Sequence, residues 1–269
     1  MKIFSYLGRL LLFVLLTALT QVGGIVVMIS WAINASVQAR WPMQWPRLFG
    51  STVFVTLYLV TSTALVPPLA KLAGRVPLPV LDGEELAPRT LWSAVLNRHY
   101  ADPELDALVR DVAHDFVHSG RPHLVYLDAC FPFFDGFPLL PHLSHNDGRK
   151  VDLAFCYRDG DGSGTACTPT VIGYGSFAKP KTNEDNTAAR CSAQGAWWYN
   201  SLGHLPSDGS ITLDEKRTRE LVRAIAADPR TGKIFLEPYL KTRWGITSDK
   251  VRFHGCHAVS HADHIHVQL

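Results

Sequence analysis

The chain ends with the nine residues His261-Ala-Asp-His264-Ile-His266-Val-Gln-Leu269, in which three histidines fall within six positions. The last residues alternate in polarity, which predicts a β-strand. Residues two apart on a strand point to the same face, so we expect His264 and His266 to project together. Two converging imidazoles suit a zinc ion, because neutral nitrogen atoms are ligands that zinc prefers. Taken alone, the stretch is equally compatible with a polar strand face or an adventitious metal binder.

A second cluster lies upstream, in the segment Ser144-His-Asn-Asp-Gly-Arg-Lys-Val-Asp152. Residues 151–155 alternate as a strand does, which places Asp152 between apolar neighbours. A carboxylate there needs a partner, because burying an unpaired charge is costly, and a metal ion supplies one. His145, Asp152 and one C-terminal histidine make the three-ligand set that leaves the fourth zinc position open to water.

These motifs resemble those of a known family. The Ser-His-x-x-Gly-x-x-x-Asp pattern with a terminal His-x-His is similar to the lysostaphin, D-Ala-D-Ala carboxypeptidase and hedgehog superfamily of zinc peptidases, and within it to the penicillin-insensitive murein endopeptidases. The stretch Lys233-Ile-Phe-Leu-Glu-Pro-Tyr-Leu-Lys241 adds to the likeness, which covers roughly residues 120–269. The resemblance implies that His145, Asp152 and His266 are zinc ligands.

The activity that the resemblance implies is hydrolysis of amide bonds in peptidoglycan peptide cross-links. Zinc in such a site lowers the pKa of water toward ~7 and polarises the scissile carbonyl. A neighbouring base must accept the proton of the water. His261 is the first candidate by the murein endopeptidase likeness, His264 the second and Asp263 the third. Asp263 stands where related carboxypeptidases carry a glutamate, and this departure leaves the base open.

Two uncharged apolar runs, residues 10–33 and 48–70, lie near the N-terminus. About 20 apolar residues suffice to cross a bilayer as a helix, so we expect two transmembrane helices. The apolar core of a cleavable signal peptide is shorter, at ~7–15 residues. The predicted organisation is a membrane anchor over residues 1–75, a linker over 76–100 and a zinc peptidase-like domain over 101–269.

The expected fold class is α+β, with a small central antiparallel sheet, flanking helices and a zinc site. Asp102 is positioned to cap a helix that begins at Pro103 and carries one apolar face. Thr212 and Glu215 form a predicted capping box for a second helix, which Asp228-Pro229 ends.

The net charge of +2 and the lack of an arginine-rich stripe interleaved with aromatics argue against nucleic-acid binding. Basic residues flank both apolar runs almost evenly, so charge leaves the membrane orientation open. We expect an inner-membrane protein with its catalytic domain in the periplasm, where the implied substrate lies. Cys156 and Cys167 could pair across a glycine-rich turn, and buried free cysteines are the alternative.

Two further motifs have simpler explanations. His114-Asp-Phe-Val-His118 resembles the helical His-Glu-x-x-His zinc motif, but its aspartate is one methylene shorter than the glutamate base, and we expect a solvated face. The turn that begins at Asp159 resembles a calcium loop, yet its twelfth position is Thr170 rather than a bidentate glutamate. We therefore predict neither a helical zinc site nor a calcium site.

Other functions fit the same sequence. A non-catalytic zinc module could bind cell-wall peptide or a partner protein without cleaving either. A D-Ala-D-Ala carboxypeptidase would use the same ligands on a different bond. A cytosolic location would instead indicate a peptidase for another substrate or a toxin-like protein.

Overall fold

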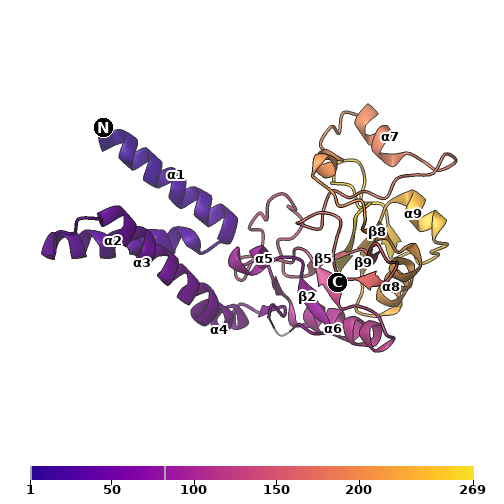
Figure 1. Cartoon of the computed structure of the whole chain (residues 1–269), viewed down its shortest axis with the longest axis horizontal. Helices are drawn as coiled ribbons and strands as arrows, with labels where there is room; N and C mark the ends of the chain where they lie inside the picture. The colour runs from indigo at the N-terminus through magenta and orange to yellow at the C-terminus, as the bar shows by residue number, and fades with distance from the viewer. Residues whose placement is uncertain (1, 82) are drawn as a thin grey trace.

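The computed structural model describes residues 2–81 and 83–269, and residues 2–5 by their backbone alone. A helical arm leads into a mixed α/β domain (Figure 1). The arm consists of α1 (Lys2–Thr20), α2 (Gly23–Arg40), α3 (Pro46–Val60), the π-helical turn η1 (Thr61–Leu65) and α4 (Val66–Leu72). Helix α2 packs against both α1 and α3, so the chain passes back and forth along the arm.

The prediction of two transmembrane helices is wrong for the first apolar run. Among the described helices, only the continuous stretch Pro46–Leu72, with 27 residues, is long and apolar enough to cross a membrane. The first run breaks at Gln21, whose φ of 64° ends α1. The Gln21 side chain is buried, and its Oε1 accepts a hydrogen bond from the backbone N–H of Phe133 at 2.9 Å. The helix break at Gln21 therefore coincides with a contact to the folded domain. Hydropathy alone does not reveal this break.

A six-stranded sheet, in the order β10-β9-β11-β5-β4-β2, forms the centre of the α/β domain. Its strands are β2 (Leu86–Pro88), β4 (Leu124–Tyr126), β5 (Lys150–Ala154), β9 (Lys233–Phe235), β10 (Val251–Arg252) and β11 (His264–Gln268). The four inner strands pair antiparallel, as predicted. Both edge strands, β2 and β10, pair parallel with their neighbours, which the sequence did not indicate.

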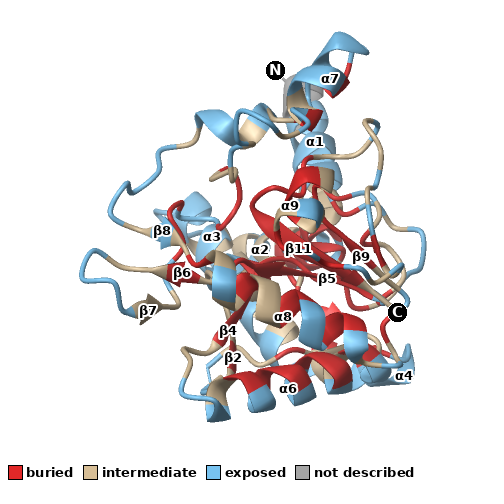
Figure 2. Ribbon diagram, turned by 90° about the vertical axis from the view of Figure 1, so that its right-hand side faces the viewer, coloured by how far each residue is buried: buried red, intermediate tan, exposed pale blue. Residues whose placement is uncertain are grey.

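Helices α6 (Pro103–His118) and α8 (Glu215–Ala227) cover one side of this sheet with their buried faces (Figure 2). The Asp102 carboxylate caps α6 as predicted, accepting from the Glu104 N–H at 2.8 Å. The cap of α8 is Asp214, whereas Thr212 lies in the strand β8 (Thr212–Leu213). The predicted N-cap of α8 was therefore wrong by two residues. Pairing of β8 with β6 extends the backbone at Thr212, so the helix cannot begin there.

The remaining elements are short and lie around the sheet. They are β1 (Val76–Pro77), α5 (Trp92–Val95), β3 (Tyr100–Ala101), β6 (Tyr157–Arg158), β7 (Gly164–Thr165), α7 (Thr187–Ala193), the 3-10 turn η2 (Ser201–His204) and α9 (Pro238–Arg243). Residues 76–100, interpreted as a linker, contain β1, β2, α5 and the first residue of β3, and they supply Leu78 and Leu86 to the core.

The pairing of β11 with β5 positions the histidines. Ile265 and Val267 are fully buried in the main core, as the alternation predicts. His266 lies directly opposite Asp152 in the register of these two strands. Since side chains of directly opposed residues share a face, the strand pairing brings together two groups that are far apart in the sequence.

Candidate metal centre

Three of the predicted ligands converge on one point. His145 Nε2 lies 3.1 Å from His266 Nδ1 and 3.2 Å from Asp152 Oδ1, and the last two atoms are 2.9 Å apart. In a tetrahedral zinc site with bonds of about 2.0–2.1 Å, ligand atoms stand about 3.3 Å apart. All three side chains are buried. The observed triangle therefore fits a small ion with little adjustment.

His142, three residues before His145, also joins this group. Its Nδ1 lies 3.1 Å from Asp152 Oδ2, and its side chain is also buried. His142, His145 and Asp152 each offer a ligand atom, and these atoms lie within 4.8 Å of one another, so the group could hold a metal ion. The His-x-x-His spacing of residues 142–145 was the available signal, but spacing in a loop does not fix where the rings point.

Local structure fixes the orientation of His145. Its Nδ1 donates to the carbonyl of Ala129 at 2.9 Å, so the Nε2 lone pair faces Asp152 and His266. Such a hydrogen bond to the non-ligating nitrogen is the usual support of a metal-binding histidine. Gly148 has a φ of +79°, and a Cβ there would lie 2.9 Å from Arg75 Nε. The glycine of the motif therefore allows close packing beneath the His145 loop.

Asp263 and His264 form a tight pair. His264 Nδ1 donates to Asp263 Oδ1 at 2.5 Å, and the other oxygen of Asp263 accepts from the Gly175 N–H. His264 Nε2 lies 3.8 Å from Asp152 Oδ1, at the edge of the ligand triangle. Both oxygens of Asp263 are thus engaged, and its geometry is that of a residue that orients an imidazole.

His261 lies beside the same cluster, and Glu237 accepts a hydrogen bond from its backbone. Its ring centroid is 4.9 Å from that of His264. Its backbone N–H donates to Glu237 Oε1 at 2.9 Å. The same oxygen accepts from Tyr199 Oη at 2.6 Å and Ser260 Oγ at 3.1 Å. Glu237 was not predicted as a site residue, although it belongs to the stretch 233–241 that carries the family resemblance.

The charges of the buried groups depend on one another. Burial raises the pKa of Asp152, but attraction to the His145 and His264 imidazoles outweighs burial and holds the pKa well below its usual range. Tyr174 Oη donates to Asp152 Oδ2 at 2.8 Å. Burial first, and then the charges of Asp152 and Asp128, raise the pKa of Tyr174 well above its usual value, so it remains a donor.

The pKa values of the four imidazoles shift in opposite directions, two downward and two upward. Burial lowers the pKa of His266 to about 4 and that of His261 well below its usual value, and nearby imidazoles add to the effect at His261. Burial also disfavours protonation of His145 and His264, but Asp152 reverses this effect at both residues and raises their pKa. The metal-free cluster therefore favours protonation at His145 and His264 over the other pair.

A cavity of about 270 Å³ opens on these groups. His145, Asp152, His261, His264 and His266 all line it, whereas Asp263 is not among its lining residues. Trp198 and the segment 257–259 form other parts of its wall. A disulfide between Cys191 and Cys256, 65 residues apart, ties α7 to the chain just before that segment. The disulfide therefore links the segment that precedes Trp198 to the segment that precedes residues 257–259.

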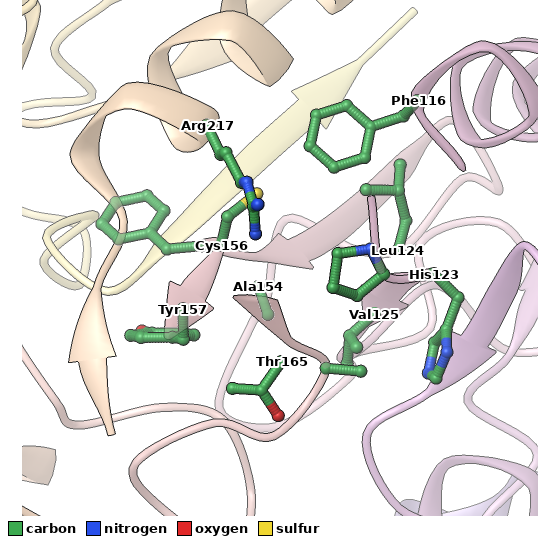
Figure 3. Close-up of a pocket in the computed structure, with 12 residues that line it drawn as sticks. Phe116, His123, Leu124, Val125, Ala154, Cys156, Tyr157, Thr165 and Arg217 are labelled. Carbon is green, nitrogen blue, oxygen red and sulfur yellow. The ribbon is translucent and has the colours of Figure 1, made fainter. Parts of the chain in front are cut away.

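The pairing of Cys156 with Cys167 is wrong: both are free, as is the buried Cys130. Figure 3 shows Cys156 in a small pocket with Phe116 and Arg217, and none of the predicted site residues lines this pocket. This pocket has a volume of about 20 Å³, enough for about one water molecule. Burial raises the pKa of the Cys156 thiol to about 12, which argues against a nucleophilic role.

A second group of potential ligands lies on the surface of α6. Glu85, His114 and His118 bring their ligand atoms within 4.8 Å of one another. The His114 and His118 side chains are 57% and 62% exposed, and Glu85 is 35% exposed. The exposure confirms the expected solvated face, to which the structure adds Glu85 from the segment before β2.

Comparison of the chain with protein-family models found no match, and comparison with curated proteins found none either. The family resemblance therefore remains a hypothesis carried by the sequence motifs.

Proposed function

We propose that the chain is a membrane-anchored zinc metallopeptidase that hydrolyses amide bonds in the peptide cross-links of peptidoglycan. The observation that carries the proposal is the convergence of His145, Asp152 and His266 in a cavity that His261 and His264 also line. A site that only stored or bound a metal would have no need of two further buried imidazoles beside the ligands.

The donor set supports zinc as the metal. Imidazole nitrogens with one carboxylate oxygen are ligands typical of catalytic zinc, and the buried triangle has tetrahedral spacing. His145, Asp152 and His266 would hold the ion, with His142 as a further donor close to Asp152. When bound, zinc supplies a Lewis acid and a water of lowered pKa.

The remaining groups, His261, His264 and Asp263, have roles in proton transfer, in stabilising negative charge and in orienting an imidazole. His261 lines the cavity with its backbone held by Glu237, which suits a residue that accepts the proton of the attacking water. His264 is held by Asp263 and can hydrogen-bond to the carbonyl oxygen as negative charge develops on it. Asp263 then acts by positioning His264 rather than as the base.

We also propose that the α/β domain lies in the periplasm. Arg40 and Arg47 flank the junction of α2 and α3, at the end of the arm away from the α/β domain (Figure 1). Lys71 and Arg75 lie at the other end, so each end carries two basic residues and the positive-inside rule leaves the orientation open. The Cys191–Cys256 disulfide favours an oxidising compartment for the domain.

The test uses the full-length protein in detergent, loaded with zinc and incubated with purified peptidoglycan. Mass spectrometry should show zinc-dependent loss of cross-linked dimers. His145→Ala should lose both metal and activity, whereas His261→Gln should retain metal and lose activity. Release of terminal D-Ala alone would identify a carboxypeptidase. Stoichiometric zinc with unchanged peptidoglycan would refute the peptidase and leave the binding module.

A further inference from the structure

A second cavity adjoins the metal centre and has no role in the proposed chemistry. It has a volume of about 280 Å³ and shares Pro141 and His142 with the cavity of the metal centre. Its walls are mainly apolar, and four separate parts of the chain contribute the aliphatic residues Leu96, Leu127, Ile172 and Leu202. A ligand that occupied both cavities would pass directly over His142.

Two arginines give this apolar cavity a positive charge. Arg89 follows the edge strand β2 and donates to Thr168 Oγ1, but among the described residues it forms no ion pair. Arg98 pairs with Asp128 at 2.8 Å, and its buried Nε has no hydrogen-bond partner in the described part of the chain. The lining therefore carries two guanidinium groups and one carboxylate, an excess of one positive charge.

The two cavities share a hydrogen-bonded wall. Asp128 Oδ2 lies 3.5 Å from both Tyr174 Oη and His142 Nδ1. Tyr174 and His142 in turn contact Asp152 Oδ2, at 2.8 Å and 3.1 Å. Such a network fixes the relative position of the arginines and the metal ligands, so a group bound in one cavity is held at a defined place relative to the other.

We propose that the second cavity is a specificity subsite for an amino-acid residue of the peptide substrate that flanks the cleaved amide and carries a free carboxylate on an apolar stem. The apolar walls bind the stem, and the excess cation together with the Arg98 Nε donor binds the carboxylate. This inference rests on the proposed function, because it assigns the cavity to the same substrate.

The experiment compares Ile172→Asp with Val171→Asp in the full-length zinc-loaded protein. Ile172 lines the cavity, whereas its neighbour Val171 is 74% exposed and lies outside it, so both changes add the same charge to the same loop. Arg89→Gln removes the unpaired cation. The substrates are a purified cross-linked muropeptide dimer and the same dimer with its carboxylates converted to amides.

Ile172→Asp and Arg89→Gln should lower kcat/KM for the carboxylate dimer by roughly tenfold or more, since a charge-assisted contact is lost. Val171→Asp should have little effect, and the parent protein should cleave the amidated dimer as poorly as the two subsite variants cleave the carboxylate dimer. Zinc content and circular dichroism should be unchanged in all variants. Equal cleavage of both dimers, or equal effects of both aspartates, would overturn the subsite.

Calorimetric titration of His261→Gln with the same two dimers separates the two hypotheses. Preferential binding of the carboxylate dimer, with no cleavage by the parent protein, would support the subsite and refute the peptidase. Cleavage by the parent without any preference in binding would support the peptidase and refute the subsite. Absence of both binding and cleavage would refute both.

Discussion

Two clusters of histidine and carboxylate occupy different environments in this domain. On α6, His114 Nδ1 donates to Glu85 at 2.9 Å, His118 Nδ1 donates to the His114 carbonyl at 2.9 Å, and water reaches both rings. At the metal centre the groups are buried, and one carboxylate, Asp152, faces the imidazoles of His145 and His266. Solvent screens the charges of the surface cluster, whereas the charge of the buried cluster must be balanced within the site, because an uncompensated charge is costly in the interior.

The strongest test of this contrast removes one carboxylate from each cluster. Asp152→Asn should abolish zinc binding and destabilise the protein by about 3–5 kcal/mol, because it leaves buried imidazoles without their counter-charge. Glu85→Gln makes the same chemical change at the surface and should alter neither property measurably. Metal analysis and denaturant unfolding check both. Zinc retention by the Asp152 variant would contradict the assignment of the ligands.

His99 separates the effect of burial from that of metal binding. It is buried and does not line the cavity of the metal centre, and its Nδ1 has no hydrogen-bond partner among the described residues. Burial lowers its pKa from 6.5 to about 4. The unfolded chain then binds a proton that the folded protein does not bind between these values, so stability falls as the pH drops from 6.5 to 4.

The loss attributable to His99 should be on the order of 3 kcal/mol, at 1.36 kcal/mol for each unit of pKa. Its measurement is the difference in unfolding free energy between the parent and His99→Gln across this pH range. A parallel pH dependence of the two proteins would show that His99 does not titrate differently on folding.

Removal of the metal should have a somewhat smaller effect. Zinc that binds the folded protein alone stabilises it by about 2.7 kcal/mol when its concentration is 100 times Kd. A chelator should therefore lower the melting temperature of the parent protein, and added zinc should restore it. The Asp152→Asn protein should melt at the same temperature with and without chelator. A chelator effect of equal size in that variant would place the stabilising metal elsewhere.

The smallest effect is expected on α6. His114→Ala combined with His118→Ala breaks only exposed contacts, each worth about 0–1 kcal/mol. Zinc stoichiometry and peptidoglycan cleavage should both stay at the parental level, as measured by metal analysis and product quantification. Loss of one zinc per chain would show that the surface cluster binds metal. It would contradict the expectation that only the buried cluster does so.

Local sequence patterns predicted the structure correctly where it depends on residues that are close together in the chain. The cap at Asp102 and the shared face of His264 and His266 follow from backbone geometry over a few residues. The break at Gln21 did not follow, because its hydrogen-bond partner Phe133 is 112 positions away. The Cys191–Cys256 disulfide was missed for the same reason, since the sequence suggested only the nearer pair Cys156 and Cys167, with free cysteines as the alternative.

Sequence alone determined which residue types could form the metal centre and which of them share a strand face, because strand periodicity is a local property. Only the tertiary structure decided which donors meet. The register of β5 and β11 sets His266 opposite Asp152 across 114 positions, the His145 loop brings in His142, and Glu237 holds the backbone of His261. These contacts depend on how strands pair and loops pack over long range, and no spacing within the chain encodes them.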